Sequence, residues 1–350
     1  MRGTISPPLF DSLTLSDVPS WKQVVARHQT PSRVSSFWQL TNSVIPYVGL
    51  WALMVWTLGI SYWITLALAV PAAGFLVRVF IIFHDCGHGS FFKSRRANTF
   101  WGVVTGMMTF TPYQQWRHDH AIHHATSGDL DRRGKGDIWT LTVREYLESS
   151  RWRRLAYRLV RNPFVLFVVA PMYLFLIQHR VPARGSRKQE RRSVLWTNAA
   201  LLGIVVLMSL TLGFKTFVLV QLPISIMATT AGVWLFYVQH QFEGVNWERR
   251  KEWDYVDAAL NGSSFYKLPK ILQWFSGNIG FHHIHHLSPG VPNYNLEKCH
   301  REEPVFQSVK AITLWASMKS LSFRLWDEQR KKLVSFRRIR AARRAKSAGS

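Results

Sequence analysis

Long uncharged runs alternate with arginine-rich segments along this chain, and the two kinds of segment predict different surroundings. No Asp, Glu, Lys or Arg occurs from Val34 to Val77, and Ser193–Phe214 and Thr216–Gln239 form a second uncharged stretch interrupted only by Lys215. A helix that crosses a bilayer needs about 20 apolar residues. Each stretch is therefore long enough for two such helices. We predict an all-α integral membrane protein with two transmembrane helix pairs, four spans in all.

Two shorter apolar segments do not fit this pattern. Asn98–Gln115 and Pro163–Gln178 are short or interrupted by Gly and Pro, and arginines flank both of them on each side. If either segment crossed the membrane alone, it would carry its downstream arginines to the opposite side, against the usual charge bias. We therefore expect interfacial or re-entrant helices at these two places.

The basic residues indicate which side of the membrane the polar segments occupy. The formal net charge of +24 would suggest nucleic acid as a partner if the protein were soluble. The arginines and lysines instead gather between and after the apolar runs, whereas the turn near Gly59 has none and the turn near Gly213 has Lys215 alone. This asymmetry places both termini and the middle region in the cytoplasm, and it explains the charge without a nucleic-acid partner.

Three parts follow along the chain. Residues 1–35 are predicted to be a cytoplasmic N-terminal segment, residues 36–310 a membrane domain with a cytoplasmic histidine-rich cap, and residues 311–350 a cytoplasmic helix with a basic tail. The two cysteines, Cys86 and Cys299, lie far apart and close to histidines. We predict no disulfide, and a reducing compartment.

Histidines are crowded at three places, "HDCGH", "HAIHH" and "HHIHH", at spacings that put them on one face of a helix. Histidine is the commonest metal ligand, and a ninth candidate ends the last apolar run. An even number of crossings separates every cluster from the next, so all should reach the same side. The nine candidate ligands are His84, His88, His120, His123, His124, His240, His282, His285 and His286.

Nine imidazoles exceed the four ligands of a tetrahedral zinc site. Two metal ions would take four or five each, with room for water, hydroxide or dioxygen. Imidazole suits zinc, copper, iron and nickel, so the ligands alone leave the metal open. A metal pair beside an apolar helix bundle suits the oxidation of a long alkyl chain, which has no acidic proton or leaving group for other catalytic machinery.

These motifs resemble the three histidine boxes of membrane fatty-acid desaturases. The flanking "GNIGFHHIHHLSPGVPNYNL" and "HHATSGDLDRRGKGDIWTLTVREY" resemble the bacterial acyl-lipid Δ12-like branch, and the resemblance covers roughly residues 35–310. It implies that the nine histidines bind a non-haem di-iron centre, which uses O2 and two electrons to leave a cis double bond in an acyl chain. Related enzymes carry an asparagine one turn before the histidine that matches His240, whereas this chain has Phe236.

Other residues near the boxes have weaker predicted roles. His118 and His283 lie outside the ligand spacing and are expected to orient ligands rather than bind metal. Asp85 and Asp119 adjoin ligands and could accept the second ring N–H of a histidine, with plain solvation as the alternative. The same role is weaker for Asp129, Asp131, Asp137 and Glu243. Cys86 is expected to be a packing residue, Arg78 to snorkel or pair, and the tail Arg330–Lys346 to bind anionic lipid or remain solvated.

Two alternatives to a desaturase remain at this stage. A histidine-box hydroxylase or ketolase acting on a carotenoid or another lipid would share the metal site. A metal transporter would instead favour ionisable residues within several spans, where this chain has almost none. No fused electron-transfer module is visible, so a desaturase would need a separate donor. The basic face would attract an acidic ferredoxin-like protein.

Overall fold

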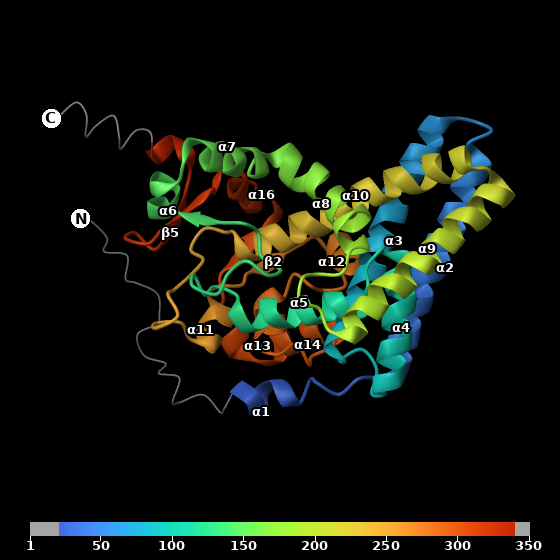
Figure 1. The fold of residues 1–350 in the computed structure, drawn as a ribbon. Helices are drawn as coiled ribbons and strands as arrows, with labels where there is room; N and C mark the ends of the chain where they lie inside the picture. Colours follow the sequence, from blue (N-terminus) through green and yellow to red (C-terminus); the bar gives the residue numbers. More distant parts are fainter. Residues whose placement is uncertain (1–20, 340–350) are drawn as a thin grey trace, which may run out of the picture.

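The computed structural model describes residues 21–339, and these are mostly helical (Figure 1). The helices are α1 (Trp21–Ala26), α2 (Arg33–Thr57), α3 (Tyr62–His88), α4 (Arg95–Met108), α5 (Tyr113–Thr126), α6 (Val143–Glu148), α7 (Arg151–Val160), η2 (Val165–Val169), α8 (Ala170–Leu176), η3 (Gln178–Arg180), α9 (Lys188–Leu212), α10 (Phe214–His240), α11 (Tyr255–Leu260), α12 (Lys270–Phe275), α13 (His282–Leu287), α14 (Asn293–Glu302), α15 (Pro304–Gln307), α16 (Leu314–Ser317) and η4 (Met318–Ser322). The strands are β1 (Leu141–Thr142), β2 (Phe265–Lys267), β3 (Ala311–Thr313), β4 (Leu325–Asp327) and β5 (Lys332–Val334).

Two long helical hairpins form one side of the molecule. Helix α2 turns near Gly59 into α3, and α9 turns at Gly213 into α10, at the two places that the charge pattern predicts. Helix α3 packs against α2, α4 and α10, with Met54, Ala69 and Ile224 fully buried between them. The shorter helices α5, α11, α13 and α14 lie toward the ends of these hairpins that are opposite the turns at Gly59 and Gly213 (Figure 1).

Three helices are long and apolar enough to cross a membrane: α3, α9 and α10. The predicted first span, α2, has 25 residues but does not meet the same test. Its inner face carries Ser36, Gln39 and Ser43, all buried, and these polar side chains lower its mean hydropathy. The fourth span therefore stays a prediction.

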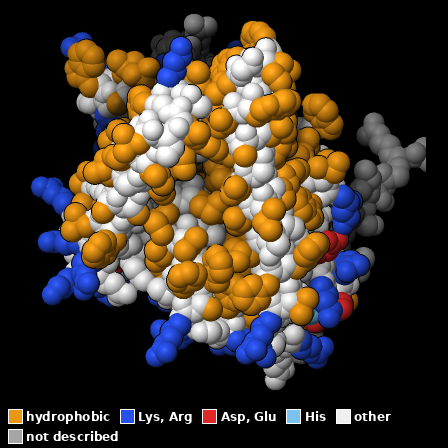
Figure 2. Space-filling model, turned by 90° about the vertical axis from the view of Figure 1, so that its right-hand side faces the viewer, with side chains coloured by type: hydrophobic (Ala, Val, Ile, Leu, Met, Phe, Trp, Pro, Cys, Tyr) orange, Lys and Arg blue, Asp and Glu red, His pale blue; other side chains and the backbone are white. Residues whose placement is uncertain are grey.

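The outer surface of the hairpins is apolar. On α9, Trp196 is 69% and Leu210 81% exposed, although water would disfavour such a continuous apolar surface. Figure 2 shows hydrophobic side chains across the middle of this face, with most of the Lys and Arg along its lower and left edges. This distribution fits lipid around the helices and headgroups at the rim, and it identifies an integral membrane protein.

The two awkward apolar segments are both interrupted. Pro163–Gln178 contains the π-helix η2, α8 and the start of η3, and it is bent by 66° from α7, as in a broken span or a re-entrant loop. Asn98–Gln115 contains most of α4 and the start of α5, with a turn at Phe110 between them. The interfacial or re-entrant placement of both segments stays a prediction.

Two small sheets depart from the all-α prediction. Strand β4 pairs in parallel with β1 and antiparallel with β5, and β2 pairs in parallel with β3. They attach residues 311–334 to the rest of the molecule, where a helix and a tail were predicted. Strands of two or three residues are too short for a periodic pattern to reveal them. Residues 340–346 of the predicted lipid-binding tail lie outside the described residues.

Candidate metal centre

The nine candidate ligands come from four helices. His84 and His88 lie on the last turns of α3, and His240 is the last residue of α10. The middle cluster lies on α5, and the last cluster forms most of α13, whose six residues are all buried. Two of these helices are candidate membrane spans, so the centre lies where they end.

Helices α3 and α5 approach each other closely because Gly87 has no side chain. A Cβ atom at Gly87 would lie 2.8 Å from the ring of Trp116 on α5. The Tyr113 hydroxyl donates to the Cys86 carbonyl at 2.6 Å, and Arg117 Nε donates to the Gly87 carbonyl at 3.0 Å. These contacts hold the two helices in register, so that their histidines face the same space.

Helix α13 is fixed against the end of α10. Gln239 donates through Nε2 to the Ile279 carbonyl at 2.8 Å, just before α13 begins. At the other end of α13, the Tyr255 hydroxyl donates to the His286 carbonyl at 2.7 Å. The hydrogen bonds therefore anchor the turns on both sides of the third histidine cluster.

The histidines form two adjacent groups. In each group one possible ligand atom per residue lies within 4.8 Å of the others. Group A contains His84, His88, His120, His124 and His285, and group B contains His123, His240 and His286. The ninth candidate, His282, has its Nε2 atom 3.0 Å from His240 Nε2, at the edge of group B. The rings of His124 and His286 stack at 4.2 Å between centroids and join the two groups.

The positions of the ring nitrogens fit metal binding better than hydrogen bonding between the rings. Several pairs of Nε2 atoms approach closely, at 3.0 Å for His285 and His124 and 3.2 Å for His123 and His240. Among the nine candidates, four buried ring nitrogens have no hydrogen-bond partner in the described chain: Nε2 of His88 and His286, and Nδ1 of His124 and His282. Buried polar atoms are normally paired, so the unpaired Nε2 atoms of His88 and His286, within groups of converging rings, indicate a missing shared partner. An all-imidazole set suits zinc, copper, iron or nickel.

The local environment keeps these imidazoles neutral. Burial, with a further contribution from neighbouring histidines, holds the pKa of His120, His124, His285 and His286 well below the usual value. A neutral imidazole keeps the lone pair that a metal ion needs. At neutral pH these four rings therefore have the chemistry of ligands rather than of cations.

A buried carboxylate orients group A. Asp85 Oδ1 lies 3.0 Å from His84 Nδ1, as the sequence suggested. Its other oxygen accepts from the backbone N–H and the side-chain amide of Asn293, at 2.7 and 2.8 Å. Gln39 of α2 then donates to Asn293 at 2.9 Å. This chain of hydrogen bonds fixes the His84 ring from behind, and nothing in the sequence pattern singled out Asn293 or Gln39.

A second carboxylate orients group B. Asp137 Oδ1 lies 2.7 Å from His123 Nδ1, and Asp137 Oδ2 accepts from the Gly134 N–H at 3.0 Å. Gly136, at φ +75°, brings this loop against the ligand: its Cβ would lie 3.0 Å from His123 Cβ. Its position next to a ligand had favoured Asp119 over Asp137 for this role. Asp119 instead forms an ion pair with Lys135 at 3.1 Å.

The other residues considered from the sequence lie away from the metal centre. His118 is 4.0 Å from Glu190, and His283 is buried beside Phe306 without a hydrogen-bond partner among the described residues. The remaining acidic candidates pair with basic side chains: Asp129 with Arg132, Asp131 with Arg249 and Glu243 with Lys319.

Arg78 pairs rather than snorkels, since its guanidinium lies 4.0 Å over the Trp274 ring. Cys86 and Cys299 are buried and free.

Phe236 lies beside group B and lines a narrow cleft. Its ring centroid lies 5.1 Å from those of both His123 and His240. The cleft, about 40 Å³, is also lined by His240, Asp137 and Gln241. The position that carries asparagine in the related enzymes therefore presents an apolar wall to the metal centre.

The fold and the site together define a membrane protein with a buried, two-part histidine centre. The chain belongs to the fatty acid desaturase family, whose sequence model matches residues 61–311, and it is an oxidoreductase. It is 54% identical over 319 residues to a fatty acid desaturase of Bacillus subtilis, covering 91% of this chain and 90% of that protein. It is 28% identical to an sn-1 oleoyl-lipid 12-desaturase of Synechocystis sp., covering 72% of this chain and 73% of that protein. An sn-1 acyl-lipid omega-3 desaturase (ferredoxin) of the same organism is 27% identical, over 63% of this chain and 62% of that protein.

Proposed function

We propose that this desaturase introduces a cis double bond into the acyl chain of a membrane lipid at a di-iron centre. One O2, two electrons and two protons are consumed with two hydrogens of the chain, and two water molecules are formed. The observation that carries the proposal is the convergence of nine imidazoles into two adjacent groups. The names of the Synechocystis relatives, both acyl-lipid desaturases, support a lipid-bound acyl group.

In this proposal group A binds one iron ion and group B, with His282, binds the other. The bound iron pair supplies the oxidising power to break unactivated C–H bonds. The chain's own residues hold and orient this pair. Asp85 and Asp137 each take the N–H of a ligand ring and fix which nitrogen faces the metal. The burial of all six residues of α13 excludes water, and Phe236 presents an apolar surface beside the centre.

The proposed orientation follows from the charge pattern. We place the protein in the cytoplasmic membrane of a bacterium, with four spans and with the histidine boxes and both termini in the cytoplasm. Residues 1–35 would then be a cytoplasmic segment, residues 36–310 the membrane domain with its catalytic cap, and residues 311–350 a cytoplasmic region. The ends of α3 and α10 meet at one metal centre, which is the arrangement that such a topology requires.

The electron donor is proposed to be a separate acidic protein of the ferredoxin class. The name of one relative includes ferredoxin, and the net charge of +24 would attract such a donor. Turnover with a saturating lipid should therefore fall as ionic strength rises, because salt screens the encounter. A rate indifferent to salt would contradict this partner.

Lipid analysis of an expressing host tests the function. A bacterial host that makes only saturated fatty acids should gain a new monounsaturated species, and mass spectrometry would locate its double bond. The matched controls are His285→Ala, a group A residue, and His118→Ala, a histidine on α5 outside both groups. We expect no product from the first variant and near wild-type product from the second. An oxygenated fatty acid or carotenoid with unchanged unsaturation would indicate a hydroxylase or ketolase instead.

A further inference from the structure

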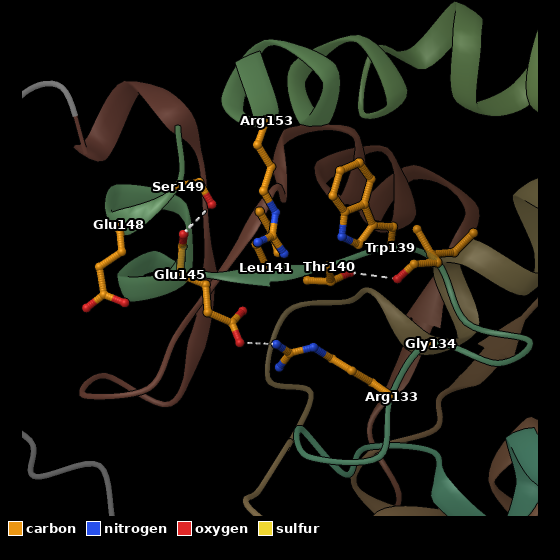
Figure 3. Close-up of a pocket in the computed structure, with 10 residues that line it drawn as sticks. Arg133, Gly134, Trp139, Thr140, Leu141, Glu145, Glu148, Ser149 and Arg153 are labelled. Atoms are coloured by element: carbon orange, nitrogen blue, oxygen red, sulfur yellow. Dashed lines mark hydrogen bonds and ion pairs between the residues drawn. The ribbon is translucent and has the colours of Figure 1, made fainter. Parts of the chain in front are cut away.

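A cavity of about 510 Å³ opens beside the loop that carries Asp137 (Figure 3). Its walls come from the loop before β1, from α6 and from the first turn of α7. Arg153 extends into it from α7, and Arg133 extends from the opposite side toward Glu145, so the two guanidinium groups face the same space. Trp139, 38% exposed, forms part of another wall.

The two arginines of this cavity are not fully paired. Arg133 forms an ion pair with Glu145, yet its Nη1 atom is buried without a partner in the described chain. Glu145 is further engaged in capping α6, since its carboxylate accepts the Thr142 N–H at 2.8 Å. Arg153 has no ion pair within residues 21–339. Glu148 also lines the cavity, but its side chain extends away from both arginines (Figure 3). The two guanidinium groups therefore face only one carboxylate, which is already engaged, and this arrangement favours an anion between them.

The cavity leads toward the metal centre. Arg133, Ile138 and Thr140 line both this cavity and the narrow cleft beside Phe236. The cleft in turn is lined by His240 of group B and by Asp137. A molecule that places its charged end between the arginines would therefore have its next part directed toward the iron ligands.

Helix α7 places the cavity next to a lipid surface. Trp152, Leu155 and Leu159 form a stripe on one face of α7, with exposures of 66%, 47% and 56%. Tyr157 on the opposite face is fully buried. An exposed apolar stripe flanked by arginines is typical of a helix that lies in the membrane interface. Arg153 lies one turn before Tyr157 and extends from α7 into the cavity, where it can reach a headgroup.

We propose that this cavity binds the phosphate of a glycerophospholipid headgroup, through Arg153 and Arg133, while the acyl chain of the same lipid extends toward group B. Arginine pairs phosphate in a bidentate geometry; Arg133 Nη1 has no partner in the described chain, and the Arg153 guanidinium has no ion pair within residues 21–339. The inference rests on the proposed function, since it names the lipid class that carries the acyl chain. A phosphate also occurs in the phosphopantetheine arm of acyl thioesters; the interfacial stripe on α7 favours the lipid.

Binding to the purified protein tests the headgroup site without turnover. The probes are dihexanoylphosphatidylglycerol, coenzyme A and octyl glucoside, titrated in a maltoside detergent. Wild-type protein should bind the phospholipid more tightly than the phosphate-free glucoside. In Arg153→Gln the phospholipid affinity should fall by about tenfold or more, the usual effect of losing a hydrogen bond to a charged group. Arg153→Lys, which keeps the charge, should recover part of it.

The matched control is Arg151→Gln, which removes the same charge from an exposed position of the same helix outside the cavity. Its affinity should change less than about twofold. Equal losses in Arg151→Gln and Arg153→Gln would overturn the site, because they would show only a general charge effect. Tighter binding of coenzyme A than of the phospholipid would overturn the assignment to a lipid.

Turnover then separates this inference from the proposed function. With phospholipid vesicles as substrate, Arg153→Gln should raise KM and leave kcat within about twofold, since the arginine is distant from the reacting carbons. If wild-type enzyme desaturates phospholipid, and Arg151→Gln and Arg153→Gln both show the same kinetics as wild type, the headgroup site is wrong. The proposed desaturase function then still holds. If wild-type enzyme makes no unsaturated product in any host or vesicle, the proposed function fails whatever the binding results.

Discussion

The two histidine groups have similar ligands but different supports. The orienting carboxylate of group A, Asp85, is 1% exposed and is held by Asn293, which is itself held by Gln39 of α2. The orienting carboxylate of group B, Asp137, is on a loop, with 18% of its side chain exposed and a backbone N–H as its other partner. Group A is thus supported from within the helix bundle, whereas group B is supported from the surface side.

This difference indicates a division of labour within one centre. The cleft beside Phe236 and the arginine-lined cavity both approach group B, and neither is lined by a residue of group A. A substrate would enter from the side where the support is a loop, which can adjust. The buried network behind group A would keep the metal pair in place meanwhile. Variants that affect one group at a time can test this asymmetry.

Loss of a ligand should give the largest effect and should act on one group at a time. If the proposed di-iron centre is right, His285→Ala in group A and His286→Ala in group B should each remove about half of the bound iron and abolish activity, because two metals are needed. Elemental analysis of purified protein measures the metal content, and fatty-acid analysis measures activity. His118→Ala, outside both groups, should keep full iron content. Complete loss of iron from either ligand variant would show that the groups bind as one unit.

Removal of the orienting charges should reveal the asymmetry directly. Partners that hold a ligand imidazole are worth about 10-fold to 100-fold in metal affinity or activity. The loss of metal affinity in Asp85→Asn should lie near the upper end of this range, since the substitution also disturbs two hydrogen bonds from Asn293. Asp137→Asn should lie near the lower end, because solvent can replace part of its contact with His123. Competition with a chelator measures both affinities, and equal losses would contradict the difference in support.

The sequence predicted the convergence of the histidines better than the residues that support them. Regular spacing placed the histidines of each cluster on one side of a helix, and a lipid-facing helix can be recognised from its apolar composition. Both features can therefore be detected within a short stretch of sequence. The Asp85–Asn293–Gln39 network joins residues more than 200 positions apart, and no local pattern encodes such pairing. Asp119 was preferred to Asp137 because it adjoins a ligand in sequence. A neighbour in a helix points about 100° away, whereas a loop can return to the ring.

Acid should reduce the stability of the folded protein through the buried, neutral histidines of both groups. Because burial lowers the pKa of His120, His124, His285 and His286, the folded protein binds fewer protons than the unfolded chain below pH 6.5. Stability is therefore full above about pH 6.5 and falls as pH decreases toward the folded pKa, by up to about 1.4 kcal/mol per pH unit for each histidine. Melting temperatures of metal-free protein in detergent, from pH 8 to pH 5, measure this loss. A flat profile would mean that the rings are accessible to protons when folded.

A methyl group placed against His123 should give the smallest effect, confined to group B. Gly136→Ala adds a Cβ at 3.0 Å from His123 Cβ and strains a residue at φ +75°. Gly185→Ala is the matched control, because Gly185 has the same φ and no atom within 4 Å of its Cβ position. Both variants should lose about 1–2 kcal/mol of stability from the backbone alone. Only Gly136→Ala should also weaken iron binding, by a few-fold, as the loop and Asp137 move away from the ring. Because backbone strain is common to both variants, a difference in iron affinity between them reports the position of His123. Equal iron affinities would show that the loop adjusts freely.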